Sequence, residues 1–149
     1  MISKILIPTD GTRASKKAID YAIGLAKQTK ASITILGVVD KSAFLAQSIP
    51  ASVSSNQMIT PIEDYLSRLT DSFIDQAVRQ CRKKGVKPTT VVRSGHPVEE
   101  IVKEARRSKA SLIVVGSHGK GALESAVLGS VTYGLIHNNT KYPVLVIRG

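Results

Sequence analysis

Residues 111–131 read SLIVVGSHGKGALESAVLGSV, and this stretch decides which fold the sequence predicts. Residues 111–115 are mostly apolar and β-branched, which is typical of a strand that is covered on both faces. Gly116 breaks this run. A glycine-containing loop then leads to Ser130, where a last helix is predicted to begin. A buried strand that continues through a loop into a helix is the repeating unit of a parallel α/β sheet.

The same alternation of short apolar runs and longer amphipathic stretches extends over the whole sequence. Helices are predicted from residue 13 to 29, from Pro61 to just before Gly85, around 98–105 and from about 130 to 138. The predicted strands lie at residues 2–8, 32–39, 89–93, 111–115 and 144–147. Residues 40–60 show no clear period, so a long loop is expected there. The order of elements predicts a parallel sheet with helices on both faces.

The second predicted helix has the most regular apolar stripe in the chain. Pro61 suits the first turn of a helix, and Gly85 suits its end. The stripe consists of Ile62, Leu66, Leu69, Phe73, Ala77 and Cys81. Because Cys81 continues this stripe, we expect it to be a core residue and not a nucleophile.

Composition indicates one globular domain that spans residues 1–149, with 42% hydrophobic and 21% charged residues. Aromatic content is 4% without Trp, which argues against a stacked-aromatic surface for single-stranded nucleic acid. The single Cys81 excludes an internal disulfide framework, so a reducing cytoplasm is the expected location. The first apolar run is too short for a signal peptide, and no stretch approaches the ~18 apolar residues of a membrane span.

Five parallel strands with right-handed crossovers allow few doubly wound orders, and 3-2-1-4-5 is a natural one. In that order the connections change direction between the first and the fourth strand. Ligands of open α/β sheets bind at such a switch point, outside the carboxyl ends of the strands. The loops that meet there are residues 8–12 (Pro-Thr-Asp-Gly-Thr) and the segment that starts at Gly116.

Neither of the two common phosphate-binding motifs fits these loops. A Walker A loop would need a glycine at Val114 and a hydroxyl residue at Gly121, and a dinucleotide fingerprint would follow the first strand. What remains is Gly116-x2-Gly119-x9-Gly129-Ser130. Free N–H groups in such a loop and the start of a helix at Ser130 would together suit a phosphate chain. Ordinary loop glycines are the alternative interpretation of this spacing.

This spacing resembles the motif of the universal stress protein family, Gly-x2-Gly-x9-Gly-Ser/Thr, at every fixed position. The resemblance extends over nearly the whole chain except residues 42–60. It includes the opening strand with its acidic turn (residues 5–10), the end of the second strand (38–40), the Gly-His-Pro exit of the third (95–97) and the closing strand (143–147). It implies the 3-2-1-4-5 sheet, a homodimer through Val144–Ile147 and, in the subgroup that keeps this motif, bound ATP.

Carried over by position, the resemblance implies that Asp10 and Val38 contact the base and ribose. It also implies that Gly116, Gly119, Gly129 and Ser130 hold the ribose and phosphates. We add His118 and Lys120, which flank Gly119, as possible sources of hydrogen bonds or charge. Pro8, Thr9 and Val131 complete the predicted site, and Mg²⁺ could accompany the phosphates.

Several of these residues have plainer interpretations, and the sequence offers little for catalysis. Asp10 could be a turn or N-cap residue, and His118 could be a solvated loop histidine. No cluster has metal-ligand spacing, and Ser125 and Ser130 lack a recognisable His–Asp arrangement. A regulatory ATP-binding module is therefore favoured over two alternatives. These are a slow ATP-hydrolysing switch and a nucleotide-independent interaction protein with an unknown protein partner.

The net charge of +10 raises the question of an anionic partner. Basic residues gather at the ends of the second and third helices, where they complement the helix dipoles. They are Arg79, Arg82, Lys83, Lys84, Lys87, Lys103, Arg106, Arg107 and Lys109. These ends should lie opposite the nucleotide loops. A solvated surface is the preferred interpretation, so the sequence makes nucleic acid an unlikely partner.

Overall fold

The computed structural model describes residues 1–40, 55–118, 128–138 and 141–149, and for residues 55–60 it describes the backbone alone. The strands are β1 (Lys4–Pro8), β2 (Ser32–Val39), β3 (Thr89–Ser94), β4 (Leu112–Gly116) and β5 (Val144–Ile147). The helices are α1 (Arg13–Thr29), α3 (Ser55–Lys83), α4 (Pro97–Arg107) and α5 (Ser130–Asn138). The predicted alternation is thus confirmed, with strand ends shifted by one or two residues, as at Lys4 and Ser94.

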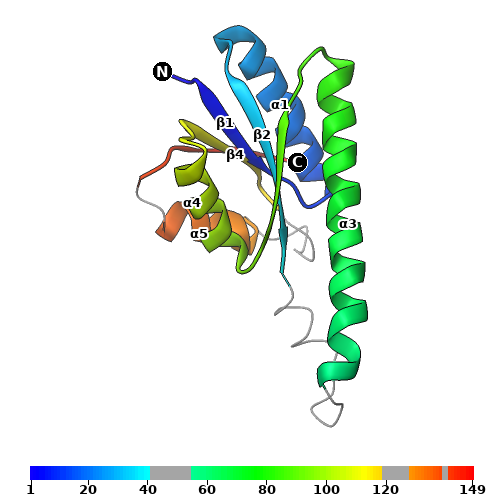
Figure 1. The fold of residues 1–149 in the computed structure, drawn as a ribbon. Coiled ribbons are helices and arrows are strands. Elements are labelled where there is room, and N and C mark those ends of the chain that lie inside the picture. Colours follow the sequence, from blue (N-terminus) through cyan, green and yellow to red (C-terminus); the bar gives the residue numbers. More distant parts are fainter. Residues whose placement is uncertain (41–54, 119–127, 139–140) are drawn as a thin grey trace.

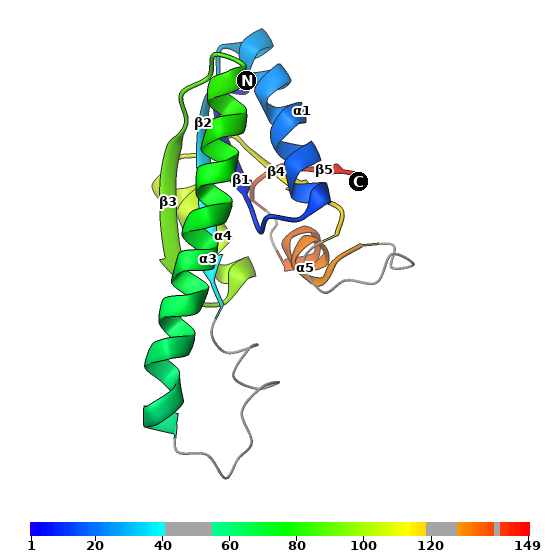
Figure 2. The same ribbon diagram turned by 90° about the vertical axis from the view of Figure 1, so that its right-hand side faces the viewer.

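The strands form one parallel sheet in the order β3-β2-β1-β4-β5, which confirms the predicted topology. Helices α1 and α3 cover one face of the sheet, and α4 and α5 cover the other (Figures 1 and 2). All strands therefore end at the same edge of the sheet, which is the edge where α1, α4 and α5 begin.

Two hydrophobic layers follow from the side-chain alternation of buried strands. In β1, Ile5 and Ile7 contact the layer under α1 and α3, whereas Leu6 contacts the layer under α4 and α5. Cys81 is fully buried in the first layer, as its place in the apolar stripe predicts.

Helix α3 is longer than the sequence predicts, because it begins at Ser55 and not at Pro61. Proline in a helix interior removes one backbone hydrogen bond, here the one to the carbonyl of Gln57. The expectation of a loop through residue 60 was therefore wrong for residues 55–60. Once a helix has formed, adding a residue costs far less than starting a new helix, so the extension needs no apolar period of its own. The rest of the expected loop, residues 41–54, lies outside the described residues.

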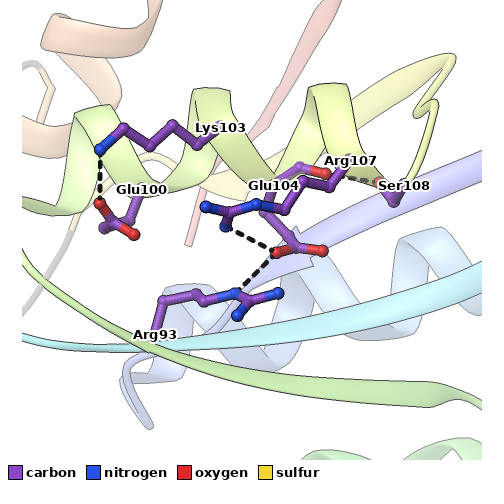
Figure 3. A network of polar contacts seen from close by, with 6 residues as sticks. All are labelled: Arg93, Glu100, Lys103, Glu104, Arg107 and Ser108. Atoms are coloured by element: carbon purple, nitrogen blue, oxygen red, sulfur yellow. Dashed lines mark hydrogen bonds and ion pairs between the residues drawn. The ribbon is translucent and has the colours of Figure 1, made fainter.

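A buried carboxylate fastens the edge strand β3 to α4. The side chain of Glu104 is 5% exposed, and its Oε1 accepts from Arg93 Nε at 3.0 Å and from Arg107 Nη1 at 3.4 Å (Figure 3). Lys103 and Glu100 form a second pair on the same helix at 3.4 Å (Figure 3). The charge of Glu104 is thus matched by two arginines from two different elements.

Among the described residues, no helix combines the length and the apolar character that a membrane crossing requires.

Candidate functional site

The first loop at the carboxyl edge is held in place by short polar contacts. Pro8 ends β1, and the next residue, Thr9, is buried. The N–H of Thr9 donates to the carbonyl of Leu36 at 2.9 Å, which continues the pairing with β2. Its hydroxyl lies 2.8 Å from the hydroxyl of Ser15 in the first turn of α1. Thr9 therefore joins β1, β2 and α1 at the point where the site begins.

Asp10 supports the N-terminal cap of α1. Its Oδ1 accepts from the backbone N–H of Thr12 at 3.0 Å and from the Thr12 hydroxyl at 2.6 Å. The Thr12 hydroxyl in turn accepts from the N–H of Ser15 at 3.2 Å, which makes Thr12 the N-cap. The plainer interpretation of Asp10 as a turn residue thus describes real contacts. Asp10 remains half-buried at the carboxyl edge, where the predicted nucleotide site lies.

Gly11 and Gly116 are both required by packing within the protein. Gly11 has a positive φ of 77°, and a Cβ there would collide with the ring of Phe73. A Cβ on Gly116 would lie 2.7 Å from the carbonyl carbon of Ala14 and 2.8 Å from its Cβ. Gly116 therefore lets the first turn of α1 approach the end of β4. This contact gives Gly116 a structural role that is independent of any ligand.

Ser117 connects the end of β4 with the other elements at this edge, and the sequence analysis missed it. Its side chain is 1% exposed, and its N–H donates to the carbonyl of Ile147 at 2.8 Å. Its carbonyl accepts from the N–H of Gly129 at 2.7 Å, and its hydroxyl lies 2.9 Å from His118 Nδ1. The N–H of Gly149 donates to the same hydroxyl at 3.4 Å. The available signal was a small hydroxyl residue directly after the glycine that ends a buried strand.

The start of α5 is fixed against β4. Gly129 is buried, and its carbonyl accepts from the N–H of Tyr133 at 2.9 Å. Thr132, which the sequence analysis also missed, donates its hydroxyl proton to the carbonyl of Gly116 at 2.8 Å. Because the N–H of Gly129 is already used by Ser117, it is not a donor for a ligand. The first-turn N–H groups of a helix, here those of Ser130 and Val131, have no acceptor within the helix.

Ser130 is exposed and Val131 is half-buried, so Ser130 lies at the surface at the positive end of α5. Val38 lies near the carboxyl end of β2 and packs against the layer under α4 and α5. His118 is half-buried behind Ser117. All three belong to the carboxyl edge of the sheet, although their elements are far apart in the sequence.

The structure thus brings most of the predicted site residues to one edge. Those at the ends of strands and at the start of α5 are Pro8, Thr9, Asp10, Val38, Gly116, His118, Gly129, Ser130 and Val131. The two remaining residues of the prediction, Gly119 and Lys120, lie outside the described residues. Their part in the site stays a prediction from the sequence.

Two further observations concern metal ligands and the cysteine of the described part of the chain. It contains no group of three or more His, Cys, Asp or Glu side chains that could hold a metal ion. Burial, with a smaller contribution from the negative charge of Asp20, raises the pKa of the Cys81 thiol to about 11. Cys81 is therefore a protonated core residue at neutral pH and lies in α3, away from the two loops.

Comparison with known proteins identifies the family. A sequence model described as the universal stress protein family matches residues 1–148. The chain is 36% identical to universal stress protein MJ0531 of Methanocaldococcus jannaschii over 148 residues, covering 99% of this chain and 83% of that protein. It is 33% identical to universal stress protein YxiE of Bacillus subtilis over 149 residues, covering 99% of this chain and 100% of that protein.

Solved structures give the same result for the fold. The structure of MJ0577 of M. jannaschii superposes with a TM-score of 0.83 at 26% identity, covering 100% of this chain and 97% of that one. Universal stress proteins solved in complex with cAMP and, from Archaeoglobus fulgidus, with dAMP share the fold, with TM-scores of 0.66 and 0.63. They cover 98% and 99% of this chain, and 96% and 98% of their own, at 24% and 16% identity. This chain belongs to the universal stress protein family.

Proposed function

We propose that this protein binds ATP at the carboxyl edge of its sheet, between the loop after β1 and the start of α5, and acts as a regulatory module. The observation that carries the proposal is the position of Ser130. This exposed serine is the first residue of α5, on the edge where β1 and β4 end next to each other. A helix N-terminus with a hydroxyl and unpaired N–H groups suits an anionic phosphate.

The chemistry of the residues fits a nucleotide with its phosphates toward α5 and its base toward β2. The N–H groups of Ser130 and Val131 and the Ser130 hydroxyl are donors, as phosphate oxygens require. Val38 supplies an apolar side chain near the end of β2, and Asp10 supplies a carboxylate that could accept from ribose hydroxyls. Gly119 and Lys120 would add a backbone donor and a positive charge by their place in the sequence motif.

Two family members with this fold were solved with adenine nucleotides, cAMP and dAMP. Their identity to this chain is too low to transfer the ligand residue by residue. The choice of ATP therefore depends on the complete Gly-x2-Gly-x9-Gly-Ser motif of this sequence. Mg²⁺ would bind together with the phosphates, whose oxygens are ligands that it prefers.

The proposed regulatory unit is a cytoplasmic homodimer that forms through β5. This strand lies at the outer edge of the sheet, and all its residues are only partly buried. An uncovered apolar edge strand invites pairing with a second copy. Nucleotide binding would then change the contacts that the dimer makes with a protein partner.

Isothermal titration calorimetry with ATP, ADP and AMP tests the proposal on the wild type and on Ser130→Asp. Aspartate at the helix start keeps a favourable dipole interaction but repels phosphate. Losing one or two charge-assisted hydrogen bonds should weaken ATP binding by about 10- to 100-fold. Gln28→Glu is the matched control, because it adds the same charge in the exposed last turn of α1, at the opposite edge.

Wild-type protein that shows no ATP binding up to millimolar concentration would overturn the proposal. Equal affinity for ATP and AMP, or an unchanged affinity in Ser130→Asp, would overturn the placement of the phosphates at α5. Phosphate release that persists through purification and disappears in Asp10→Ala would instead favour the slow ATP-hydrolysing switch.

A further inference from the structure

Every strand of the sheet is introduced by a lysine at the edge opposite the proposed nucleotide site. Lys4 is the first residue of β1, and the other four lysines precede their strands by two or three residues. In the order of the sheet, from β3 to β5, these residues are Lys87, Lys30, Lys4, Lys109 and Lys141. We call this set the lysine row. All five side chains are exposed.

The register of the sheet places the row across the strand starts, with Lys30 and Lys109 two residues before the level of Lys4 and Lys87. Lys4 pairs with Ser32, and the β2–β3 register continued by two residues brings Lys87 level with Ser32. The N–H of Ser111 donates to the carbonyl of Lys4 at 2.8 Å, which fixes the approach to β4 beside it. Neighbouring strands lie about 4.8 Å apart, so the row extends over about 19 Å.

Four of the five lysines have no acidic partner in the part of the chain that the structure describes. The described connections that carry the row contain no Asp or Glu, namely residues 1–4, 30–31, 84–88, 108–111 and 141–143. Among the described residues, Lys4, Lys30, Lys87 and Lys109 form no ion pair. Of the acidic side chains in the nearby helices, Asp20 pairs with Lys84 and Glu104 with Arg93 and Arg107 (Figure 3). Lys141 lies 5.7 Å from the ring of Tyr142.

Helix dipoles explain only part of this arrangement. They favour cations in the last turns of helices, such as Lys27, Arg82 and Arg106. Strand starts have no comparable dipole, so Lys4 and Lys87 have no such explanation. In the sequence the basic residues stand out at the ends of helices, and only the sheet topology brings these five together at the strand starts.

Two members of the row occupy backbone positions that disfavour lysine. Lys30 has φ 60° and Lys109 has φ 54°, and they are the only non-glycine residues with positive φ in the described ranges. Glycine adopts this conformation without steric cost, whereas for other residues it raises the conformational free energy by about 1 kcal/mol or more. The chain therefore places a charge at two helix ends where glycine would be more stable. An outlier of this kind points to a function for the side chain.

We infer that the lysine row binds the phosphodiester backbone of a nucleic acid, without reading its bases. Each strand of a duplex carries one charge per ~3.4 Å of helix axis, so about 19 Å of one strand presents five or six phosphates to the five lysines. The connections of the row expose no large apolar side chain except Met1. A membrane-binding surface would combine its basic residues with apolar ones that insert. The geometry therefore favours a linear polyanion over a lipid surface. The inference departs from the expectation drawn from the sequence, and the experiment below decides between them.

Fluorescence anisotropy with a labelled 20-base-pair duplex of arbitrary sequence tests this inference on the full chain at several salt concentrations. Five phosphate contacts predict a slope of about −4 to −5 for log K against log salt, with no preference among sequences. The variant Lys4→Gln/Lys87→Gln/Lys109→Gln should reduce the slope by about 3 and weaken binding at least tenfold. ATP binding should stay unchanged in this variant, because the row lies at the opposite edge.

The matched control is Lys16→Gln/Lys17→Gln/Arg68→Gln, which removes the same charge from exposed positions on α1 and α3. It should change binding by less than about threefold. A second variant, Lys30→Gly/Lys109→Gly, should raise Tm while it weakens DNA binding, because it relieves two positive-φ positions and removes two charges. A variant that is more stable yet binds less cannot be explained by misfolding.

Three results would overturn the inference. These are no binding of the duplex at 50 mM salt, an equal loss in the two triple variants, and a loss of DNA binding in neither lysine-row variant. Binding to vesicles of anionic lipid or to polyglutamate that depends on the row, without duplex binding, would assign the row to another partner and overturn it as well.

Discussion

The backbone N–H of Ser117 donates to the carbonyl of Ile147 at 2.8 Å, which joins the end of β4 to the last residue of β5. The carbonyl of Ser117 accepts from Gly129 directly before α5, and its hydroxyl lies 2.9 Å from His118 Nδ1. One buried residue therefore contacts the proposed nucleotide loop and the proposed dimer strand. A ligand that displaces the nucleotide loop could therefore shift the dimer strand through contacts of this one residue.

Replacing Ser117 by alanine should weaken ATP binding several-fold. The change removes the hydroxyl that orients His118 and accepts from Gly149, and it should cost about 0.5–1.5 kcal/mol of stability. Ser111→Ala is the control, because its hydroxyl makes comparable bonds to Ser3 and Lys4 at the opposite edge. Calorimetry with ATP should separate the two variants even where urea unfolding gives similar losses. Equal ATP affinities would contradict a positioning role for Ser117.

Replacing Gly116 by alanine should destabilise the fold before it affects any ligand. The added Cβ would lie 2.7 Å from the backbone of Ala14, and overpacking of this kind costs about 1–3 kcal/mol. Gly24→Ala is the matched control, since nothing lies within 4 Å of its Cβ position in α1. That change should stabilise the protein by about 0.5–1 kcal/mol. Urea unfolding monitored by circular dichroism measures both, and a Gly116→Ala protein as stable as the wild type would refute the packing role.

Proline at the outer edge of β5 should disrupt the proposed dimer. The carbonyls of Pro143 and Ile147 bond to β4 and the sequence alternates, so the N–H of Val146 points away from β4. Val146→Pro removes this donor and leaves the pairing with β4 intact. Light scattering should show a monomer at concentrations where the wild type is a dimer.

Val92→Pro is the control for this prediction, because it removes the corresponding outward N–H at the other edge of the sheet, on β3. Its oligomeric state should equal that of the wild type. If Val92→Pro dissociates the dimer and Val146→Pro does not, the interface lies on β3. A wild type that is monomeric at all concentrations would exclude both edges.

The Cys81 thiol should make stability fall with pH in the alkaline range. Burial raises its pKa to about 11, whereas an unfolded thiol titrates near about 8.5. Between these values the unfolded chain loses a proton that the native protein keeps, so unfolding becomes easier as pH rises. Urea unfolding of the wild type and Cys81→Ala from pH 7 to 10.5 should show a stability difference that shrinks with pH. A constant difference would show that the thiol does not titrate in this way.

The sequence predicts the fold well because each buried strand and each amphipathic helix has its own local pattern of apolar residues. β2, α1, α5 and β5 begin and end where the sequence predicts, since apolar runs, glycines and a hydroxyl residue mark their limits. The start of α3 was missed because Pro61 was interpreted as the first turn of the helix, although Met58 and Ile59 precede Ile62 at helical spacing.

The candidate site was harder to predict than the fold. Glycine spacing located its loops, but the roles of Ser117 and Thr132 depend on contacts with Ile147 and Gly116 that only the folded chain brings together. The lysine row was missed for the same reason, since its members come from five separate connections. Their alignment is a property of the sheet register and not of any local stretch.

The close contact between Gly116 and Ala14 means that a glycine at this position of a related protein is not by itself evidence of nucleotide binding. A chain that lost its nucleotide would still need this glycine, because the first turn of α1 would otherwise collide with the end of β4. Selection for foldability alone would preserve the first position of the motif. Ser130 is exposed and is not required by packing. Its replacement in a related protein would therefore be better evidence that this protein does not bind phosphate.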